Sequence, residues 1–482
     1  MTRTLLLAAA VLTISSACSA ADSPTSTAAV APSTTVGTSS TTATPEPPRE
    51  FSPLPTDLST PPPPVATGPF DEALTAALDA LFGSFATDTD EAAIEQVGKS
   101  GDARAAWLLS DVMRFFQQGV VAEATADAFA QLTGYDPAPN GVVPGVTWQL
   151  VTDQLIAWDL PVPPEYADFK SRLFLLVEPE WEAFFADDSS SIDWRWVSWG
   201  GVLADTRALG DQLPCPGGCI PALDDPSTTD AEGGSWYPDE SIVFGVVVGD
   251  EARAYPKNIM QVHEMVNDTI GGRRLGIPYC TLCGSAQAFF TDDVPDGIEI
   301  PVLRTSGLLS RSNKVMYDLT TRSVFDTFTG EALSGPLRTA NIVLPQASVV
   351  VSTWGDWKAA HPNTTIVARD GGIDRTYPID PLRGRDDNGP IFPTGPVDAR
   401  LPVQEPVLGL DGASGPVAFP VQAATTALKA GEIVELDGVT LMLDGSGLRA
   451  VDDAGSEVAS HEAFWFAWSQ FFPGTQLWQA DF

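Results

Sequence analysis

The stretch IVFGVVVGDEARAYP, residues 242–256, contains an apolar run, 242–248, and a segment of alternating polar and apolar residues, 251–256, separated by Gly249-Asp250. This pattern is typical of a β-hairpin, because a glycine supplies the positive φ angle that a tight turn requires. Residues 257–266 return to helical spacing, and the Gly-Gly pair at 271–272 then leads into a further expected strand that ends at Cys280. The sequence therefore predicts a β-rich region around this hairpin.

A second stretch of the same kind, PVLGLDGASGPVAFP, occupies residues 406–420. Gly245 of the first stretch corresponds to Gly409 of the second, an offset of 164 (409 − 245). Paired tryptophans that begin at Trp354 and Trp465 recur at an offset of 111 (465 − 354), so the second copy is 53 residues shorter (164 − 111). We predict two related β-rich repeat units, 205–400 and 401–482, the second of them shortened.

The N-terminal half has a different pattern. Residues 70–200 carry apolar side chains at helical spacing, as in Leu74, Leu78 and Leu81, which predicts a helical domain and makes the whole chain α+β. We expect this domain to act as a scaffold or as a docking surface for an unidentified partner in the cell envelope. Residues 19–68 consist mainly of Ser, Thr, Ala and Pro and cannot bury a core, so we expect a disordered stalk there.

The first 18 residues have the pattern of a bacterial secretory signal. Arg3 precedes an apolar run over 5–14, and small residues lead to Cys18. Ser15 stands where a lipobox usually has Leu. We expect an exported protein that is lipid-anchored through Cys18 to the outer face of the cytoplasmic membrane, or else secreted. No other stretch is long and apolar enough to cross a bilayer, so this anchor is the only expected membrane contact.

The charge of the chain narrows the range of partners. Its 63 acidic and 26 basic residues give a net charge of −37. A surface this acidic repels phosphate groups, which argues against nucleic acids and anionic membranes as partners.

Two segments contain most of the candidate functional residues. They are YPKNIMQVHEMVNDTIGGRRLGIPYCTLCGSAQAFF at 255–290 and SGLLSRSNKVMYDLTTRSVFDTFTG at 306–330. In these motifs the chain resembles the bacterial domain-of-unknown-function 3179 family, over roughly 205–480. It departs from the family pattern at Thr281, where Pro is usual, and at Phe325, where Trp is common. The resemblance implies a family but no reaction.

His263, Cys280 and Cys283 lie within 21 residues of one another and have no counterpart in the second unit. Two thiolates and one imidazole are ligands that suit copper or zinc. We predict that the three residues bind one metal ion, copper before zinc. The candidates for a fourth ligand are Met316, Glu264 and Asp318, or a water if the site is catalytic.

Two other interpretations of this site stay open. In one, Cys280 and Cys283 form a thiol–disulfide redox pair. In the other they form a plain structural disulfide, His263 is a core histidine, and the protein is a non-catalytic envelope scaffold. For Cys215 and Cys219, in the loop PCPGGC, we predict a disulfide staple. The sequence does not decide whether the protein is an enzyme.

Overall fold

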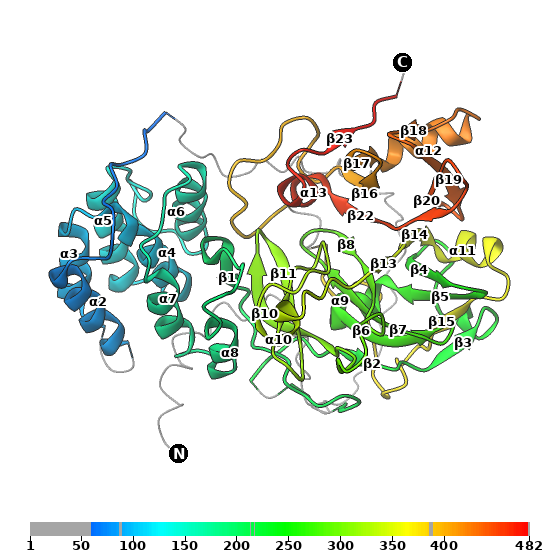
Figure 1. The fold of residues 1–482 in the computed structure, drawn as a ribbon, viewed down its shortest axis with the longest axis horizontal. Coiled ribbons are helices and arrows are strands. Elements are labelled where there is room, and N and C mark those ends of the chain that lie inside the picture. The colour runs from blue at the N-terminus through cyan, green and yellow to red at the C-terminus, as the bar shows by residue number, and fades with distance from the viewer. Residues whose placement is uncertain (1–58, 86–88, 213, 216, 385–388, 481–482) are drawn as a thin grey trace, which may run out of the picture.

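The computed structural model describes residues 59–85, 89–212, 214–215, 217–384 and 389–480. The predicted signal peptide, Cys18 and the stalk as far as residue 58 lie outside these residues. A helical part leads into a larger part made of small sheets (Figure 1), which confirms the predicted order of a helical region followed by a β-rich region. No helix among the described residues has the length and apolarity needed to cross a membrane.

The helical part begins at Glu72. Asp71 and Asp90 start its first two helices, because their carboxylates accept backbone N–H groups of the first turn. The α-helices are α2 (Glu72–Ser84), α3 (Glu91–Lys99), α4 (Ala106–Phe115), α5 (Val120–Thr133), α6 (Val146–Ala157), α7 (Tyr166–Phe174) and α8 (Glu182–Phe185). Short 3-10 turns are η1 (Ala103–Ala105), η2 (Pro179–Trp181) and η3 (Trp194–Trp196).

The described residues of the β-rich part form five small sheets. The first has the order β1 (Val197–Trp199), β10 (Leu303–Ser310), β11 (Asn313–Asp318), β12 (Val324–Phe325). The second has the order β13 (Gln346–Ala347), β9 (Ala288–Phe290), β7 (Arg273–Cys280), β6 (Met265–Ile270), β2 (Leu223–Asp224), and β8 (Ser285–Ala286) also pairs with β7.

The third and fourth sheets have the same strand order and pairing. The third is β14 (Val350–Thr353), β4 (Ile242–Val248), β5 (Glu251–Pro256), β15 (Thr365–Val367), with β3 (Thr228–Asp230) added at its edge. The fourth is β22 (Ser460–Phe464), β16 (Pro406–Gly412), β17 (Gly415–Pro420), β23 (Gln476–Leu477). In each sheet the first two pairings are antiparallel and the next is parallel.

The fifth sheet and the remaining helices complete the β-rich part. Its order is β18 (Glu435–Leu436), β19 (Val439–Asp444), β20 (Gly447–Asp452), β21 (Glu457–Val458). The helices are η4 (Gly233–Trp236), α9 (Lys257–His263), α10 (Gly335–Thr339), α11 (Trp354–Ala360), α12 (Val421–Lys429) and α13 (Trp465–Phe471).

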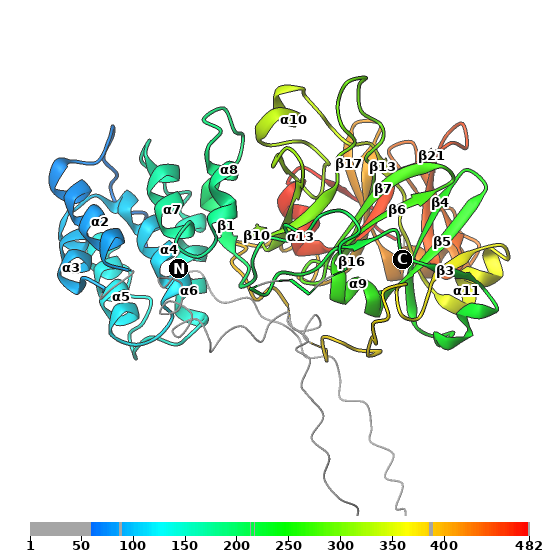
Figure 2. The same cartoon turned by 90° about the horizontal axis from the view of Figure 1, so that it is seen from below.

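The five sheets form a propeller-like ring. Figure 2 shows the same elements from below. The first sheet contacts the second through β10 and β6, the second contacts the third through β6 and β5, and the third contacts the fifth through β14 and β20. Helix α12 packs on both the fifth and the fourth sheet, and β22 of the fourth returns to β8 of the second. The backbone N–H of Phe464 donates to the carbonyl of Cys283 at 2.8 Å. The C-terminal sheet thus covers the turn that holds this cysteine.

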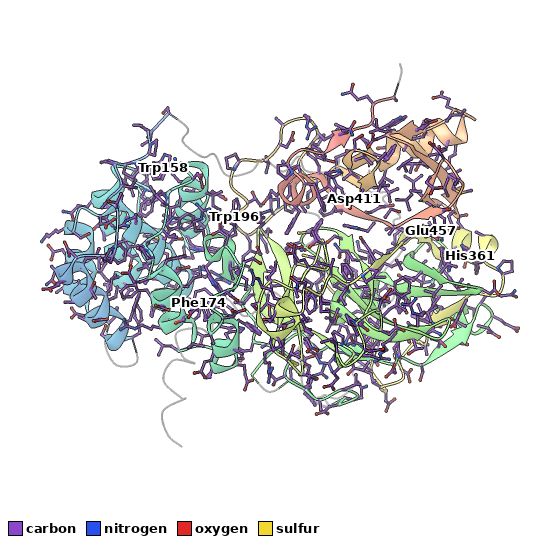
Figure 3. The ribbon with its side chains drawn as sticks, in the orientation of Figure 1. Trp158, Phe174, Trp196, His361, Asp411 and Glu457 are labelled. Carbon is purple, nitrogen blue, oxygen red and sulfur yellow. A yellow bond between two sulfur atoms is a disulfide. The ribbon has the colours of Figure 1, made fainter. Side chains whose placement is uncertain are left out.

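The helical part is packed firmly against the first sheet. One apolar core contains Trp107 and Phe174 from the helices together with Leu308 and Tyr317 from β10 and β11. The indole N–H of Trp181 also donates to the carbonyl of Ser306 at 2.7 Å. Figure 3 labels Trp196 at this junction. Both parts can therefore contribute to one site.

Candidate functional site

The predicted metal ligands lie at one edge of the second sheet. His263 ends α9, Cys280 ends β7, and Cys283 lies in the turn from β7 to β8. Strands β6 and β7 are antiparallel, so the residues just before β6 and at the end of β7 meet at the same edge. Proximity of the backbone does not, however, bring the three side chains to one point.

The imidazole of His263 is fully occupied by protein partners. It is buried, with Nδ1 2.7 Å from the carbonyl of Pro221 and Nε2 2.6 Å from the hydroxyl of Tyr377. Burial lowers the pKa of His263 to about 3, so the ring is neutral and has one donor and one acceptor nitrogen. Nδ1–H donates to the carbonyl and Nε2 accepts from Tyr377, which leaves no lone pair for a metal ion. In this structure His263 is therefore not placed as a metal ligand beside the two thiols.

Met316 is also not a ligand of the predicted site. Its side chain is fully buried in a core cluster with Met265, Leu303 and Phe325, whereas Cys280 and Cys283 belong to a different cluster. Among the described residues, the one group of His, Cys, Asp or Glu with ligand atoms within 4.8 Å of one another is Asp205, Cys215 and Cys219. The predicted set of His263, both thiols and Met316 is not assembled.

Cys280 and Cys283 are free thiols in this structure, and both are buried. Both sulfurs approach the carbonyl of Ser312 in the turn between β10 and β11, at 3.9 Å for Cys280 and 3.4 Å for Cys283. One turn of chain therefore holds both sulfurs in the same place. This arrangement differs from the plain disulfide interpretation.

The pKa values of the two thiols are shifted in opposite directions. Burial raises the pKa of Cys280, but a hydrogen bond from Cys283 and the backbone N–H and charge of Lys314 outweigh burial, so this pKa lies below its usual value. Burial and the neighbouring Cys280 raise the pKa of Cys283 well above its usual value. A thiolate at Cys280 accepts the single proton of Cys283, and that proton is then not shared with Ser312. Of the two, Cys280 is therefore the thiol that loses its proton more readily.

A buried ion pair lies beside these thiols. Nζ of Lys314 is 3.1 Å from Oε2 of Glu264, and the hydroxyl of Thr281 donates to Oε1 at 3.2 Å. Lys314 also donates to the carbonyls of Glu264 and Tyr279, so its three N–H groups have three acceptors. The charge of Lys314 is thus held in a fixed place. Glu264 has a φ of 51°, a left-handed conformation that non-glycine residues keep chiefly where the surroundings enforce it.

The thiol and the ion pair open onto a small cavity of about 50 Å³. Cys280, Glu264, Thr281 and Lys314 are among its polar lining residues. Most of the rest of the lining is apolar: Val202, Ile220, Leu282, Leu308, Leu309, Val315, Leu382, Ile391 and Phe392. Such a cavity suits a small, largely apolar molecule whose reactive group meets Cys280.

Other residues of the recognised motifs stabilise the fold. Asn267 donates to Asp224 at 2.9 Å, and Arg304 binds the same carboxylate at 2.8 and 2.9 Å. Asp268 accepts from Arg253 and Tyr255, each at 2.7 Å. These groups are buried and mutually paired, so they fix the sheets around the cavity rather than react.

Cys215 and Cys219 lie at disulfide-bonding distance from each other, in agreement with the predicted loop staple. Together with Asp205 they also form a group whose ligand atoms are close enough to one another to hold a metal ion. The carboxylate of Asp205 is already bound by Arg207 at 2.7 and 2.8 Å and by the backbone N–H of Ala222 at 2.8 Å. A metal ion would need reduced sulfurs and would compete with these bonds.

Lys314 is not among the site residues predicted from the sequence, and Glu264 is among them only as a candidate fourth ligand. The available signal was position: Glu264 directly follows His263, and Lys314 lies in the same short segment as Met316. That signal does not say which of the neighbouring side chains faces the thiols.

Comparison with known proteins gives one match. The model of a family described as "Protein of unknown function (DUF3179)" matches residues 217–447, a range that contains Glu264, Cys280, Cys283 and Lys314. No curated protein and no solved structure matches the chain.

Proposed function

Because this chain belongs, through residues 217–447, to the DUF3179 family of unknown function, we infer its function from the site itself and propose that Cys280 and Cys283 perform thiol–disulfide exchange. The observation that carries this proposal is that Cys280 is a free thiol at the wall of an apolar cavity, with a second free thiol held beside it. The substrate class is a small disulfide, and the cavity receives one of its halves.

The reaction proceeds in two exchanges. The Cys280 thiolate attacks one sulfur of the substrate disulfide, forms a mixed disulfide, and releases the other half as a thiolate that takes up a proton. Cys283 then gives up its proton, and its sulfur attacks the sulfur of Cys280. The Cys280–Cys283 disulfide forms and the second half of the substrate leaves as a thiol. Two electrons pass from the dithiol to the substrate, and an external thiol reverses both steps.

The acidity of Cys280 does not need a helix. A reactive Cys-x-x-Cys pair commonly has its first thiol at a helix N-terminus, but here the turn after β7 leads into β8. The buried charge and backbone N–H of Lys314, with the proton of Cys283, take over that role and lower the pKa of Cys280. Glu264 holds Lys314 in place, although its own negative charge raises the pKa of Cys280.

Redox titration with mass spectrometry tests the proposal. Protein is equilibrated in glutathione buffers of increasing oxidised fraction, quenched with an alkylating agent and digested. We expect a reversible Cys280–Cys283 disulfide in the wild type. Cys283→Ser should accumulate a stable mixed disulfide between glutathione and Cys280, whereas Cys280→Ser should form none.

A Cys215→Ser/Cys219→Ser variant is the matched control and should keep the Cys280–Cys283 titration. The proposal fails if folded wild-type protein keeps both thiols through the whole titration. It also fails if Cys280→Ser and Cys283→Ser trap glutathione equally, because then the two thiols do not differ in role.

A second candidate function is metal binding at Asp205, Cys215 and Cys219, which the short distances among their ligand atoms favour. Two thiolates with one carboxylate suit zinc better than copper, because a carboxylate is a hard ligand. We expect one zinc ion per chain after reduction and none in the oxidised protein. His263→Ala should not change this stoichiometry. Loss of the zinc in that variant would indicate that the ion binds at His263, Cys280 and Cys283, as predicted from the sequence, and not at Asp205.

We also propose that the third and fourth sheets are copies of one unit. Tyr255-Pro256 and Phe419-Pro420 both end the second strand of a hairpin and precede a helix. In each copy an indole N–H donates to a threonine hydroxyl seven residues later, Trp357 to Thr364 at 2.9 Å and Trp468 to Thr475 at 3.0 Å. Shared strand order and shared side-chain bonds support a duplication.

Export and lipid attachment remain part of the proposal. The N-terminal pattern around Cys18 supports a lipoprotein on the outer face of the cytoplasmic membrane, and intact mass of the mature N-terminus tests it. Recovery of an unlipidated soluble form would contradict it. The alternative is a non-catalytic role, in which an envelope partner docks on the helical part. In that case deletion of 70–200 should abolish the function of the protein, whereas the double substitution Cys280→Ser/Cys283→Ser should not.

A further inference from the structure

A second cavity, of about 140 Å³, lies where the helical part meets the first sheet. Its walls include Trp194 and Trp196 from η3, Arg311 from the turn after β10, Asp326 after β12, and Phe471 at the end of α13. Three separate parts of the fold therefore meet in it. It shares only Leu308 and Val315 with the cavity at Cys280.

Arg311 has an unusual environment in this cavity. Its guanidinium lies between two aromatic rings, 5.0 Å from the ring centre of Trp196 and 5.3 Å from that of Phe471. One nitrogen donates to the carbonyl of Gln470 at 2.8 Å. Within the described part of the chain it forms no ion pair, unlike nearby Arg195 and Arg322, which bind Asp193 and Glu180. A positive charge is thus held rigidly at the wall, and among the described residues no carboxylate lies within ion-pair distance of it, although Asp326 and Asp193 are near enough to interact with it electrostatically.

Asp326 contributes a carboxyl group to the same cavity; burial raises its pKa, and the backbone N–H groups of Thr329 and Phe328 and the charge of Arg311 act in the opposite direction. Its Oδ1 accepts the backbone N–H groups of Phe328 at 2.8 Å and of Thr329 at 3.0 Å, and these bonds fix the carboxylate. No ion pair joins Asp326 to Arg311 or to another basic side chain in the part of the chain that the structure describes. Partly buried charges of opposite sign that do not meet each other can be joined by a ligand that carries both signs.

The remaining walls define the body of that ligand. Leu308, Val315 and Val324 supply aliphatic surface, and Trp196 adds an aromatic ring. Asp193 also lines the cavity, but Arg195 binds its carboxylate at 2.7–3.1 Å, so it is not available to a ligand cation. We propose that this cavity binds a small zwitterion, an α-amino acid with an apolar side chain, whose carboxylate meets Arg311 and whose ammonium group meets Asp326.

Calorimetric titration of the whole protein with L-leucine tests this site, with tryptophan fluorescence as a second signal from Trp194 and Trp196. Two analogues each lack one charge: 4-methylpentanoate has no ammonium group, and isoamylamine has no carboxylate. We expect leucine to bind and each analogue to bind at least about tenfold more weakly, because each loses a charge-assisted contact. Equal binding of 4-methylpentanoate would make the site one for simple organic acids and would overturn the proposal, as would no binding of leucine at millimolar concentration.

Variants separate the two charges from general effects on folding. Arg311→Gln and Asp326→Asn should each weaken leucine binding at least about tenfold, and Arg338→Gln, outside the cavity, should leave it unchanged. Asp326→Asn keeps the size of the side chain, so it decides the question if Arg311→Gln does not fold. Cys280→Ser should bind leucine like the wild type, because this site does not depend on the thiols. Unchanged affinity in folded Asp326→Asn would refute the proposal.

Discussion

Nζ of Lys314 lies 3.1 Å from Oε2 of Glu264, with side-chain exposures of only 4% and 9%. The two residues are 50 positions apart in the chain and face the same cavity as Cys280. A charge pair this deeply buried is stable only while both partners are present.

Replacing Lys314 by methionine should have two effects. The pKa of Cys280 should rise, because the charge of Lys314 lowers it, so the alkylation rate measured against pH should shift to higher pH. The free energy of unfolding should fall by about 3–5 kcal/mol, because the carboxylate of Glu264 is left buried and unpaired. In Lys314→Met/Glu264→Gln the stability loss should be smaller than in Lys314→Met alone. Equal losses measured in urea would show that the two charges are not coupled.

Glu462 should make stability depend on pH in a definite direction. Burial raises the pKa of Glu462 to about 8, from an ordinary value of 4.5. Between these values the unfolded chain loses the proton and the folded chain keeps it, so the contribution of Glu462 to stability is present below pH 4.5 and is lost as the pH rises through about 8. Glu462→Gln should therefore gain stability over the wild type as pH rises, by about 5 kcal/mol at most.

Urea unfolding of both proteins at pH 6, 7 and 8.5 measures that difference. The same substitution at exposed Glu432 controls for the loss of one negative charge. A difference between wild type and Glu462→Gln that does not change with pH would show that Glu462 is ionised in the folded protein.

Gly245→Ala and Gly409→Ala should destabilise the protein to similar extents, about 1–3 kcal/mol each. A Cβ atom at either position would come within 2.3 Å of an indole ring, that of Trp357 for Gly245 and of Trp468 for Gly409. Gly474→Ala, where an added Cβ meets nothing within 4 Å, is the control. Thermal or urea unfolding checks the set, and a marked effect at only one of the first two positions would count against two copies of one unit.

Arg304→Met should lower the free energy of unfolding by about 3–5 kcal/mol, since it leaves the buried carboxylate of Asp224 without its main partner. Arg304 is completely buried, and two of its nitrogens lie 2.8 and 2.9 Å from the two oxygens of that carboxylate. Arg338→Gln, at a partly exposed arginine, should change stability by less than about 0.5 kcal/mol. Wild-type stability in Arg304→Met would show that the network contributes little.

Local patterns predicted local structure well. The segments on either side of Gly249-Asp250 form β4 and β5, which pair in the register that the turn requires. The spacing of Leu74, Leu78 and Leu81 corresponds to one buried face of α2. Each of these predictions depends only on residues a few positions apart, and periodicity contains that information.

The site could not be read in the same way, because its decisive contacts span long stretches of chain. His263 bonds to Pro221, 42 residues away, and to Tyr377, 114 residues away. Nothing in the spacing of His263, Cys280 and Cys283 reveals that distant segments already satisfy the imidazole. The sequence therefore placed His263, Cys280 and Cys283 near one another, but the distant partners of His263 could not be read from it.

The strand that covers Cys283 contains Phe464, which follows that cysteine by 181 residues (464 − 283) and is synthesised later. Phe464 on β22 donates to the carbonyl of Cys283, and its ring lies where a side chain on Gly284 would be. A growing chain therefore has both thiols well before their cover exists. Whether Cys280 and Cys283 are first a dithiol or a disulfide then depends on two rates: the rate at which the fourth sheet docks over them and the rate at which oxidants react with the thiols. Oxidation in this protein can thus be decided by the order of folding events rather than by equilibrium.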